Sequence, residues 1–388
     1  MKPSPSNDVS PGPIVLFGSG ETSPSGRKVF ERVLRHLPMR PRLALLETPA
    51  GFELNSAQVI GRVGEFLVHR LQNYQPQVEI VAARQRGTPF SPDDPHIVAP
   101  LLSADLIFMG PGSPSYAVRQ LRDSLCWQYL LARHRLGAAL VLASAAAIAV
   151  STVSLPVYEI YKVGEDIHWK EGLNLFAAYG LDLVFVPHWN NMEGGAELDT
   201  RHCFMGEERF SRLLAMLPEE MTVVGLDEKT ALLIDPESGQ CQVVGAGGVT
   251  LLHTGHLHKR SPLAHAAEQS PAQALPAGLQ AVIDQRESHY HYYHDGETFP
   301  LSDIGPFRTY HPEASLPPEV WQAALAARQP AEEEPAMAPP EQVLSLVQQR
   351  EQARLRKDWQ AADELRNKAA ELGWVIMDTP EGPQVSRK

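Results

Sequence analysis

The amino-acid sequence predicts an α/β protein with a doubly wound, mostly parallel sheet and a small helical appendage at its C-terminal end. Over roughly the first 255 residues, short apolar runs alternate with amphipathic stretches. Most of these apolar runs end in Gly, Ser or His. A Pro- and Ala-rich stretch at 327–340 then precedes a segment with helical patterning. Together these three observations predict one large α/β domain followed by a separate small module.

The apolar runs are continuous rather than alternating, which is typical of parallel strands covered on both faces. The βαβα order implies right-handed crossovers, and ligands of such sheets bind beyond the carboxyl ends of the strands. The strands are predicted at 14–17, 42–46, 78–82, 105–109, 138–142, 181–186 and 223–226, and helices at 26–36, 55–74, 115–134 and 207–217.

The pattern changes after residue 227, where short runs separated by turn residues predict antiparallel strands. We therefore expect the α/β domain to cover 12–255. Residues 256–340 are expected to form a poorly patterned extension with a Pro- and Ala-rich linker. The segment 341–388 reads as two helices, with Gly373 as the stop signal of the second.

Composition excludes several classes of protein. The formal net charge of -12 disfavours nonspecific binding to nucleic acids or anionic membranes, although a local basic patch is compatible with it. The three cysteines show no CxxC spacing, which predicts inert thiols in a reducing compartment. The longest apolar run, 138–150, is shorter than the roughly 20 residues that a membrane span needs. Residues 1–13 lack the apolar region of a secretory signal, so we expect a cytoplasmic protein without membrane contact.

Ser144 is the first candidate for chemistry. It follows a predicted buried strand and precedes Ala145, Ala146 and Ala147. A nucleophile at a sharp strand–helix turn needs small neighbours, and the N-terminus of the following helix can stabilise an oxyanion. On composition alone, a serine in an Ala-rich core helix explains the same residues.

Four segments in order carry a family resemblance. They are Met-Gly-Pro-Gly-Ser at 109–113, Ala-Ser-Ala-Ala-Ala at 143–147, a glycine-led strand at 180–188 that ends in His188, and Gly-Leu-Asp-Glu-Lys-Thr-Ala-Leu at 225–232. This order resembles the cyanophycinase and dipeptidase E-type serine peptidase family, a branch of the class I glutamine amidotransferase-like, flavodoxin-like fold. The resemblance covers about residues 12–252.

The resemblance implies that Ser144 is a nucleophile and His188 its general base. It also implies a carboxylate that orients the histidine, and Glu159 is our choice, with Glu165 and Asp166 behind it. Two noncatalytic alternatives stay open: His188 could be hydrogen-bonded to a nearby loop, and Glu159 could be a surface or ion-paired carboxylate. A glutaminase is disfavoured, because that chemistry uses a cysteine at the elbow.

The backbone N–H groups of Gly112 and Ala145 would form the oxyanion hole. The sequence departs from the family pattern at Ala146, which replaces the elbow glycine, and at Pro111, which lies inside the glycine loop. Ala146 would resist a positive φ, and Pro111 removes one N–H donor. Either change could weaken the site.

Two further segments could contribute binding residues. Gly18-Ser19-Gly20 resembles half of a dinucleotide fingerprint, but a lone GxG is weak and we expect this loop to line the pocket instead. His289, His291 and His294 in the Tyr-rich stretch 288–295, and His311 nearby, could bind a divalent metal, although nothing fixes a ligand set. We predict no metal and no cofactor.

Five residues are expected to contact the substrate, namely Gly20, Glu21, Ser113, Trp189 and Asn190.

The segment 341–383 resembles the C-terminal tail of cysteinyl-tRNA synthetase. The resemblance rests on 349–354, 357–359, 362–366, 372–373 and 378–382. The chain has no HIGH or KMSKS motif, so we do not expect an active synthetase. From residue 341 on there are eight basic and eight acidic residues, without the basic footprint usual for RNA binding. A docking or homo-oligomerisation module and a tRNA- or RNA-binding module both remain open.

The leading prediction is therefore a serine hydrolase that cleaves a peptide or isopeptide bond of a small peptide-like substrate through an acyl-enzyme. The alternative is a noncatalytic pocket protein of the same fold, whose tail binds tRNA, another RNA or a protein partner.

Overall fold

The computed structural model describes residues 10–218, 220–254, 290–308, 315–328, 339–379 and 382–387. The chain divides into two compact units, Met1–Arg328 and Gln329–Lys388, and each is described by itself. No helix in the described part of the chain is both long and apolar enough to cross a membrane.

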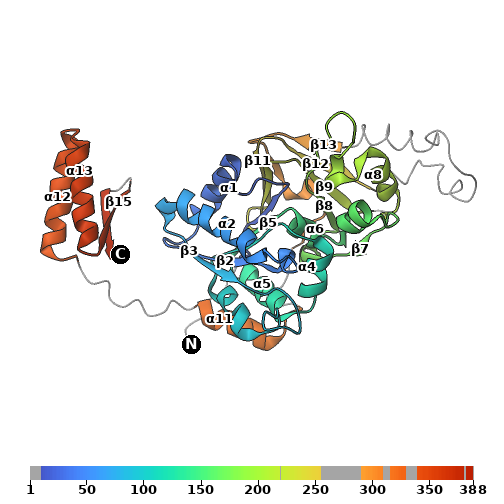
Figure 1. Ribbon diagram of the computed structural model, residues 1–388, viewed down its shortest axis with the longest axis horizontal. Helices are drawn as coiled ribbons and strands as arrows, with labels where there is room; N and C mark the ends of the chain where they lie inside the picture. Colours follow the sequence, from blue (N-terminus) through green and yellow to red (C-terminus); the bar gives the residue numbers. More distant parts are fainter. Residues whose placement is uncertain are drawn as a thin grey trace, which may run out of the picture. The chain divides into compact units, whose positions relative to one another are not determined.

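The centre of the first unit is an eight-stranded sheet with the order β14-β11-β10-β1-β5-β4-β2-β3 (Figure 1). Five strands are parallel and three at one end are antiparallel, which confirms the predicted α/β class. The parallel strands are β1 (Ile14–Phe17), β2 (Arg42–Leu46), β3 (Gln77–Val81), β4 (Leu106–Met109) and β5 (Ala139–Ala143); the antiparallel strands are β10 (Thr230–Asp235), β11 (Gln240–Gly245) and β14 (Thr298–Pro300).

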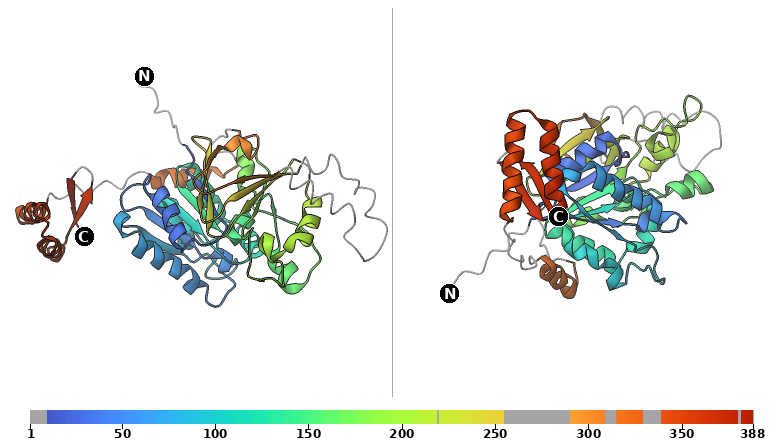
Figure 2. Two further views of the ribbon diagram at one scale, coloured as in Figure 1. Left: turned by 90° about the horizontal axis from the view of Figure 1, so that it is seen from above. Right: turned by 60° about the vertical axis from the view of Figure 1, so that its left-hand side comes forward.

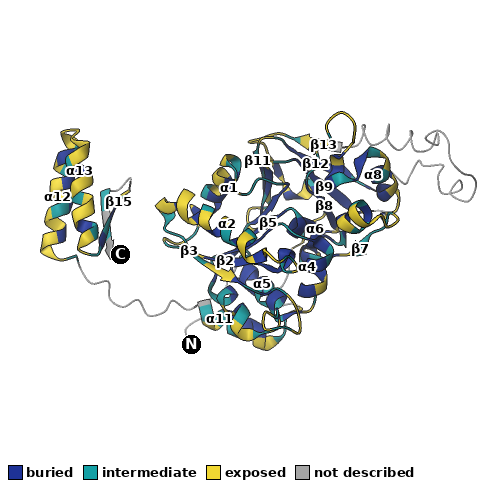
Figure 3. Ribbon diagram, viewed as in Figure 1, coloured by how far each residue is buried: buried dark blue, intermediate teal, exposed yellow. Residues whose placement is uncertain are grey.

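The continuous apolar runs are explained by burial on both faces of this sheet. Every residue of β1, β4 and β5 is buried. Along β1, Ile14 and Leu16 join one hydrophobic cluster, whereas Val15 and Phe17 join another. Figure 2 shows the helices around the sheet, and Figure 3 shows that the strands are buried whereas the outer faces of the helices are exposed. Helices α1 (Pro24–Leu34) and α2 (Ser56–Arg70) supply one cluster, and α4 (Pro114–Leu121) and α5 (Leu125–Arg135) supply the other.

A second sheet has the order β13-β12-β9-β8. Its strands are β8 (Leu183–Val186), β9 (Thr222–Leu226), β12 (Val249–His253) and β13 (Tyr290–Tyr293). β8 and β9 are parallel, whereas β12 is antiparallel to both of its neighbours. Helix α8 (Gly206–Ala215) packs Phe210, Leu213 and Leu214 into the cluster that includes inward residues of β8 and β9. The runs at 181–186 and 223–226 thus pair with each other rather than extending the main sheet.

The first unit continues beyond the boundary expected at residue 255. β13 pairs with β12, and β14 pairs with β11. Helix α11 (Pro318–Arg328) packs Val320, Trp321 and Ala324 against Ala132 and Leu136 of the α5 region. The remainder of the expected extension, 256–289, 309–314 and 329–338, lies outside the described residues.

The second unit contains the two predicted helices, α12 (Glu341–Leu355) and α13 (Trp359–Glu371). An unpredicted hairpin of β15 (Trp374–Thr379) and β16 (Gly382–Arg387) follows them. Gly373 has a φ of 81° directly after α13, as its role as a helix stop requires. Arg350, only 4% exposed, donates hydrogen bonds of 2.8 Å to both carboxylate oxygens of Asp378 and so links α12 to the hairpin.

Candidate active site

Ser144 lies at a sharp turn between β5 and helix α6 (Ala145–Ala149). Its backbone has φ 52° and ψ -109°, a region that residues other than glycine rarely adopt. The Ser144 N–H donates to the Phe17 carbonyl at 3.1 Å, which ties the turn to β1. Ala146 lies inside α6 and is not among the positive-φ residues, so the expected difficulty at this position does not arise.

The Ser144 hydroxyl meets the imidazole of His188. Oγ of Ser144 lies 2.9 Å from Nε2 of His188, although the two residues are 44 positions apart. Ser144 follows β5 of the main sheet, whereas His188 follows β8 of the second sheet. His188 also has a positive φ, 51°, and its carbonyl accepts the N–H of Asn191 and the N–H of Cys203, both at 3.2 Å.

The carboxylate at His188 is Glu228, not Glu159. Nδ1 of His188 lies 3.2 Å from Oε1 of Glu228. Glu159 lies instead in the short π-helix η4 (Glu159–Val163), where it accepts a hydrogen bond from Nζ of Lys170 at 2.8 Å. The prediction that Glu159 orients His188 is therefore wrong. The Glu159 carboxylate is paired with Lys170 instead, which agrees with the alternative of an ion-paired carboxylate.

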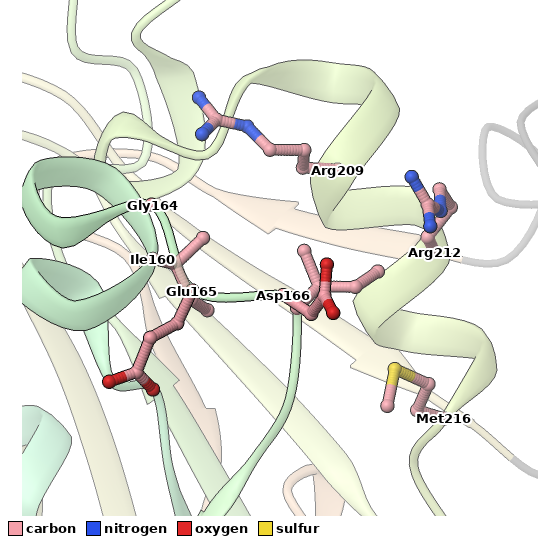
Figure 4. A pocket seen from close by; sticks show the side chains of 8 residues that line it. Ile160, Gly164, Glu165, Asp166, Arg209, Arg212 and Met216 are labelled. Carbon is pink, nitrogen blue, oxygen red and sulfur yellow. The ribbon is translucent and has the colours of Figure 1, made fainter.

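Glu165 and Asp166, the second choices for this carboxylate, lie at a different place in the first unit. A carboxylate oxygen of Glu165 lies 3.7 Å from Nε2 of His168. Glu165 and Asp166 line a separate pocket of about 630 Å³, together with Arg209 and Arg212 of α8 (Figure 4).

Strand register explains why Glu228 is the residue at His188. β8 and β9 are parallel, and Val186 is opposite Gly225. Because the carboxyl ends of parallel strands meet at one edge, His188 and Glu228 emerge side by side. Two features of the sequence could have indicated Glu228. It lies in the 225–232 segment that carries the family resemblance, and it follows a buried apolar run, as Ser144 and His188 do.

The charges at the site are interdependent. The hydrogen bond from His188 holds the pKa of Glu228 below its ordinary value, against the effect of burial, and the amide of Asn191 adds to this. Burial raises the pKa of Glu21, and the nearby His188 offsets part of that rise. Burial also raises the pKa of Cys203 to about 12, with a contribution from the charge of Glu228. Cys203 is therefore an inert thiol, and the other two cysteines are likewise buried and free.

The expected oxyanion donors lie at, or shortly before, the first residues of the helices α6 and α4. Gly112 precedes α4 and has φ 143°; a Cβ there would lie 2.0 Å from the Pro49 carbonyl oxygen. Ala145 is the first residue of α6. β4 and β5 are parallel with Met109 opposite Leu142, and Gly112 and Ala145 each lie three positions beyond these paired residues. Within the described residues, neither the Gly112 N–H nor the Ala145 N–H donates to a backbone carbonyl in a loop, turn or cap.

The loop after β1 reaches the same edge. A Cβ on Gly18 would lie 2.1 Å from the Asp227 carbonyl oxygen, and Oγ of Ser19 accepts the Lys229 N–H at 3.0 Å. Gly20 has φ 75° in the turn that precedes α1. This close packing places Gly20 and Glu21 beside the loop of Glu228, and the electrostatic effect of His188 on Glu21 agrees with it.

The other three expected substrate contacts are engaged by protein groups. The Ser113 hydroxyl caps α4 by accepting the Tyr116 N–H at 3.2 Å. The Trp189 ring packs on Gly225, where a Cβ would approach it to 2.4 Å, and on the ring of His202. Asn190 uses Oδ1 to accept the Glu228 N–H at 2.8 Å. Asn190 therefore holds the backbone of Glu228, a role that sequence reasoning missed.

The His-rich stretch contributes strand residues. His291 lies on β13 and His294 follows it, whereas His289 and His311 lie outside the described residues. In the part of the chain that the structure describes, no three His, Cys, Asp or Glu side chains gather as metal ligands would.

Comparison with solved structures supports the fold of the first unit. The chain aligns with the crystal structure of a peptidase from an acI-B1 Actinobacterium, with a TM-score of 0.54 and 20% identity, over 75% of this chain and 98% of that one. The fold is similar to that of a peptidase. This likeness bears out the peptidase-type resemblance as a statement about fold.

The second unit matches a different family. Residues 338–385 match the model of the cysteinyl-tRNA ligase anticodon binding domain. The cysteine–tRNA ligase of Methanosarcina acetivorans is 50% identical over 48 residues, and that of Chlamydia abortus is 48% identical over 48 residues. The match spans 12% of this chain and 10% of each ligase, so it concerns the C-terminal unit alone.

Proposed function

We propose that the first unit is a serine hydrolase that cleaves a peptide or isopeptide bond of a small peptide-like substrate. The observation that carries this proposal is the hydrogen-bonded series from Ser144 Oγ to His188 Nε2, at 2.9 Å, and from His188 Nδ1 to Glu228 Oε1, at 3.2 Å. A hydroxyl, an imidazole and a carboxylate in this order are the parts of a serine nucleophile and its base.

The protonation states follow from the hydrogen bonds. Glu228, whose pKa is lowered, is ionised at neutral pH and can only accept, so Nδ1 of His188 carries a proton. Nε2 is then free to accept the Ser144 hydroxyl proton as Oγ attacks the substrate carbonyl carbon. The backbone N–H groups of Gly112 and Ala145 would stabilise the oxygen that becomes negative.

The tetrahedral intermediate collapses when His188 returns the proton to the leaving nitrogen and the C–N bond breaks. Water, activated by the same imidazole, then attacks the acyl-serine, and the carboxylic acid leaves as Oγ regains its proton. Each step uses groups of this chain and water only.

A fluorophosphonate probe tests the proposal directly. We expect the wild-type protein to be labelled at Ser144, as located by peptide mass spectrometry, and the Ser144→Ala variant to remain unlabelled. Ser238→Ala, at an exposed turn between β10 and β11, is the matched control and should label normally. Absence of labelling in the wild type would favour the alternative, a noncatalytic pocket protein.

A second function is favoured for the C-terminal unit by its match to the anticodon binding domain family. We propose that this unit binds RNA, with tRNA as the first candidate. Trp359, the first residue of α13, is 60% exposed, and the exposed cations Arg356 and Lys357 lie in the turn just before it. An exposed aromatic ring beside cations can stack on an unpaired base while the cations contact phosphates.

The full chain should therefore bind a tRNA pool in fluorescence anisotropy at 50 mM salt, with weaker binding at 200 mM salt. Trp359→Ala should weaken binding by about tenfold, as the loss of one stacked base predicts. Leu344→Ala, another exposed apolar residue of α12, is the control and should bind as the wild type does. If neither salt nor the tryptophan affects binding, this function is wrong.

A further inference from the structure

The carboxylate of Glu228 accepts two hydrogen bonds on a single oxygen. Oε1 lies 3.2 Å from Nδ1 of His188 and 3.0 Å from Nδ2 of Asn191. The Glu228 backbone is held as well, because its N–H donates to Oδ1 of Asn190. Two consecutive asparagines thus fix the glutamate, one through its main chain and one through its side chain.

The Asn191 amide has only one orientation that satisfies its surroundings. Its Oδ1 accepts the Glu193 N–H at 3.0 Å, so its NH₂ group must face Glu228. The residue is fully buried, at 0% exposure, and water therefore cannot replace these contacts.

The main chain of Asn191 is anchored in the same way. Its N–H donates to the His188 carbonyl at 3.2 Å. Its carbonyl accepts the Thr200 hydroxyl at 3.3 Å, and that hydroxyl also accepts the Gly194 N–H. The turn 188–191 is consequently closed on itself, and the amide of Asn191 cannot rotate away without breaking buried hydrogen bonds.

We propose that Asn191 is a positioning residue, which holds the Glu228 carboxylate on Nδ1 of His188 and thereby keeps the Nε2 lone pair directed at Ser144. The inference rests on the proposed hydrolase function for its chemical meaning, but the positioning itself is a property of the three side chains. Without the amide, Glu228 loses one of its two side-chain donors. It can then turn toward solvent, which it reaches because its side chain is 30% exposed.

Two substitutions of similar size separate this role from general loosening of the fold. Asn191→Leu removes the donor, so Glu228 should leave Nδ1 and the imidazolium should lose its stabilising anion. The His188 titration midpoint should then fall by about one pH unit. Asn191→Asp places a second carboxylate beside Glu228 and His188, and the midpoint should rise by about one unit. Glu21, Cys203 and Lys229, which also interact electrostatically with His188 or Glu228, remain in both variants.

The measurement is NMR of the full-length protein with labelled histidine, with the His188 signal assigned by its loss in His188→Gln. We expect opposite shifts of the midpoint in the two variants, and a loss of the single Nδ1–H tautomer in Asn191→Leu. Thr222→Val removes hydrogen bonds to the Ile304 carbonyl and to His253 from β9, the strand that leads to Glu228, without touching Glu228 or Asn191. It should lower the melting temperature but leave the His188 midpoint and tautomer unchanged.

Fluorophosphonate labelling of the same proteins separates the two proposals. If Asn191→Leu labels at least tenfold more slowly than the wild type and its tautomer changes, both stand. If the wild type does not label but the His188 midpoint shifts as expected, the positioning role stands and the hydrolase proposal falls. An unchanged midpoint and tautomer in Asn191→Leu, in a protein that labels at Ser144, would overturn the role of Asn191 alone.

Discussion

Glu228 accepts its hydrogen bond from Nδ1 of His188 at 3.2 Å from a position 40 residues further along the chain. The two residues meet because β8 and β9 are parallel neighbours whose carboxyl ends share one edge of the second sheet. Ser144 comes to the same place from a different sheet. The candidate site is thus assembled across two sheets, with one residue from the main sheet and two from the second.

Glu228→Gln should lower the rate of fluorophosphonate labelling at Ser144 by about 10²- to 10⁴-fold, because a neutral amide cannot stabilise the imidazolium or hold its tautomer. Glu159→Gln is the control. It changes the contacts of Lys170 and Ser115, which do not contact His188, and labelling should stay within about twofold of the wild type. A larger loss in Glu159→Gln than in Glu228→Gln would restore Glu159 as the orienting carboxylate.

Glu21→Gln should stabilise the protein increasingly as the pH rises from about 4 to about 7. Burial raises the pKa of Glu21 above its ordinary value of 4.5, so the folded state binds this proton more tightly than the unfolded state does. Below the pKa that Glu21 has in the unfolded state, its carboxyl is neutral in both the folded and the unfolded state and does not lower the free energy of unfolding. Above the folded pKa it must be ionised in both, and the cost of a buried charge is fully present.

The measurement is the melting temperature of wild type and Glu21→Gln at both pH values. The exposed Glu237→Gln serves as the control for removal of a surface charge. An equal difference in melting temperature at pH 4 and pH 7 would show that Glu21 is not held in a desolvated environment.

Gly225→Ala should destabilise the first unit by about 1–3 kcal/mol, because an added Cβ has no room. That atom would lie 2.4 Å from the Trp189 ring, which in turn packs on His202. Gly61→Ala, in α2, has no atom within 4 Å of the added Cβ and should stabilise by up to about 1 kcal/mol. Urea unfolding followed by tryptophan fluorescence gives both values, and equal effects of the two changes would contradict the packing described.

Asp378→Ala should loosen the C-terminal unit more than Glu351→Ala does. Arg350 is nearly fully buried and donates two hydrogen bonds of 2.8 Å to Asp378, whereas its contact with Glu351 is 3.4 Å long. Removing Asp378 leaves the buried guanidinium without its main acceptor, which is costly in a desolvated site. Amide hydrogen exchange of α12 in the full chain should accelerate at least tenfold in Asp378→Ala. Equal exchange in the two variants would argue against this link.

Local pattern was sufficient for most of the strands and for the strand–helix turn that carries Ser144. β1, β4 and β5 are buried on both faces, so their apolar runs are continuous and could be recognised without knowing their neighbours. The small residues around Ser144 likewise reflect a local demand of the strand–helix turn. The two C-terminal helices were also predictable, because their pattern and stop residue lie within the segment itself.

Pairing between distant strands was decided only by the tertiary structure. A run such as 223–226 has the same composition whether it extends the main sheet or pairs with 183–186 in a second one. That choice determines which carboxylate reaches His188. Asn190 and Asn191 have no sequence signature of their roles, because both act on a glutamate about 37 residues away. The sequence by itself thus determined which segments are strands and where the hydroxyl lies, since these depend on local burial and turn geometry. The partners of that hydroxyl depend on strand register, which only the folded chain specifies.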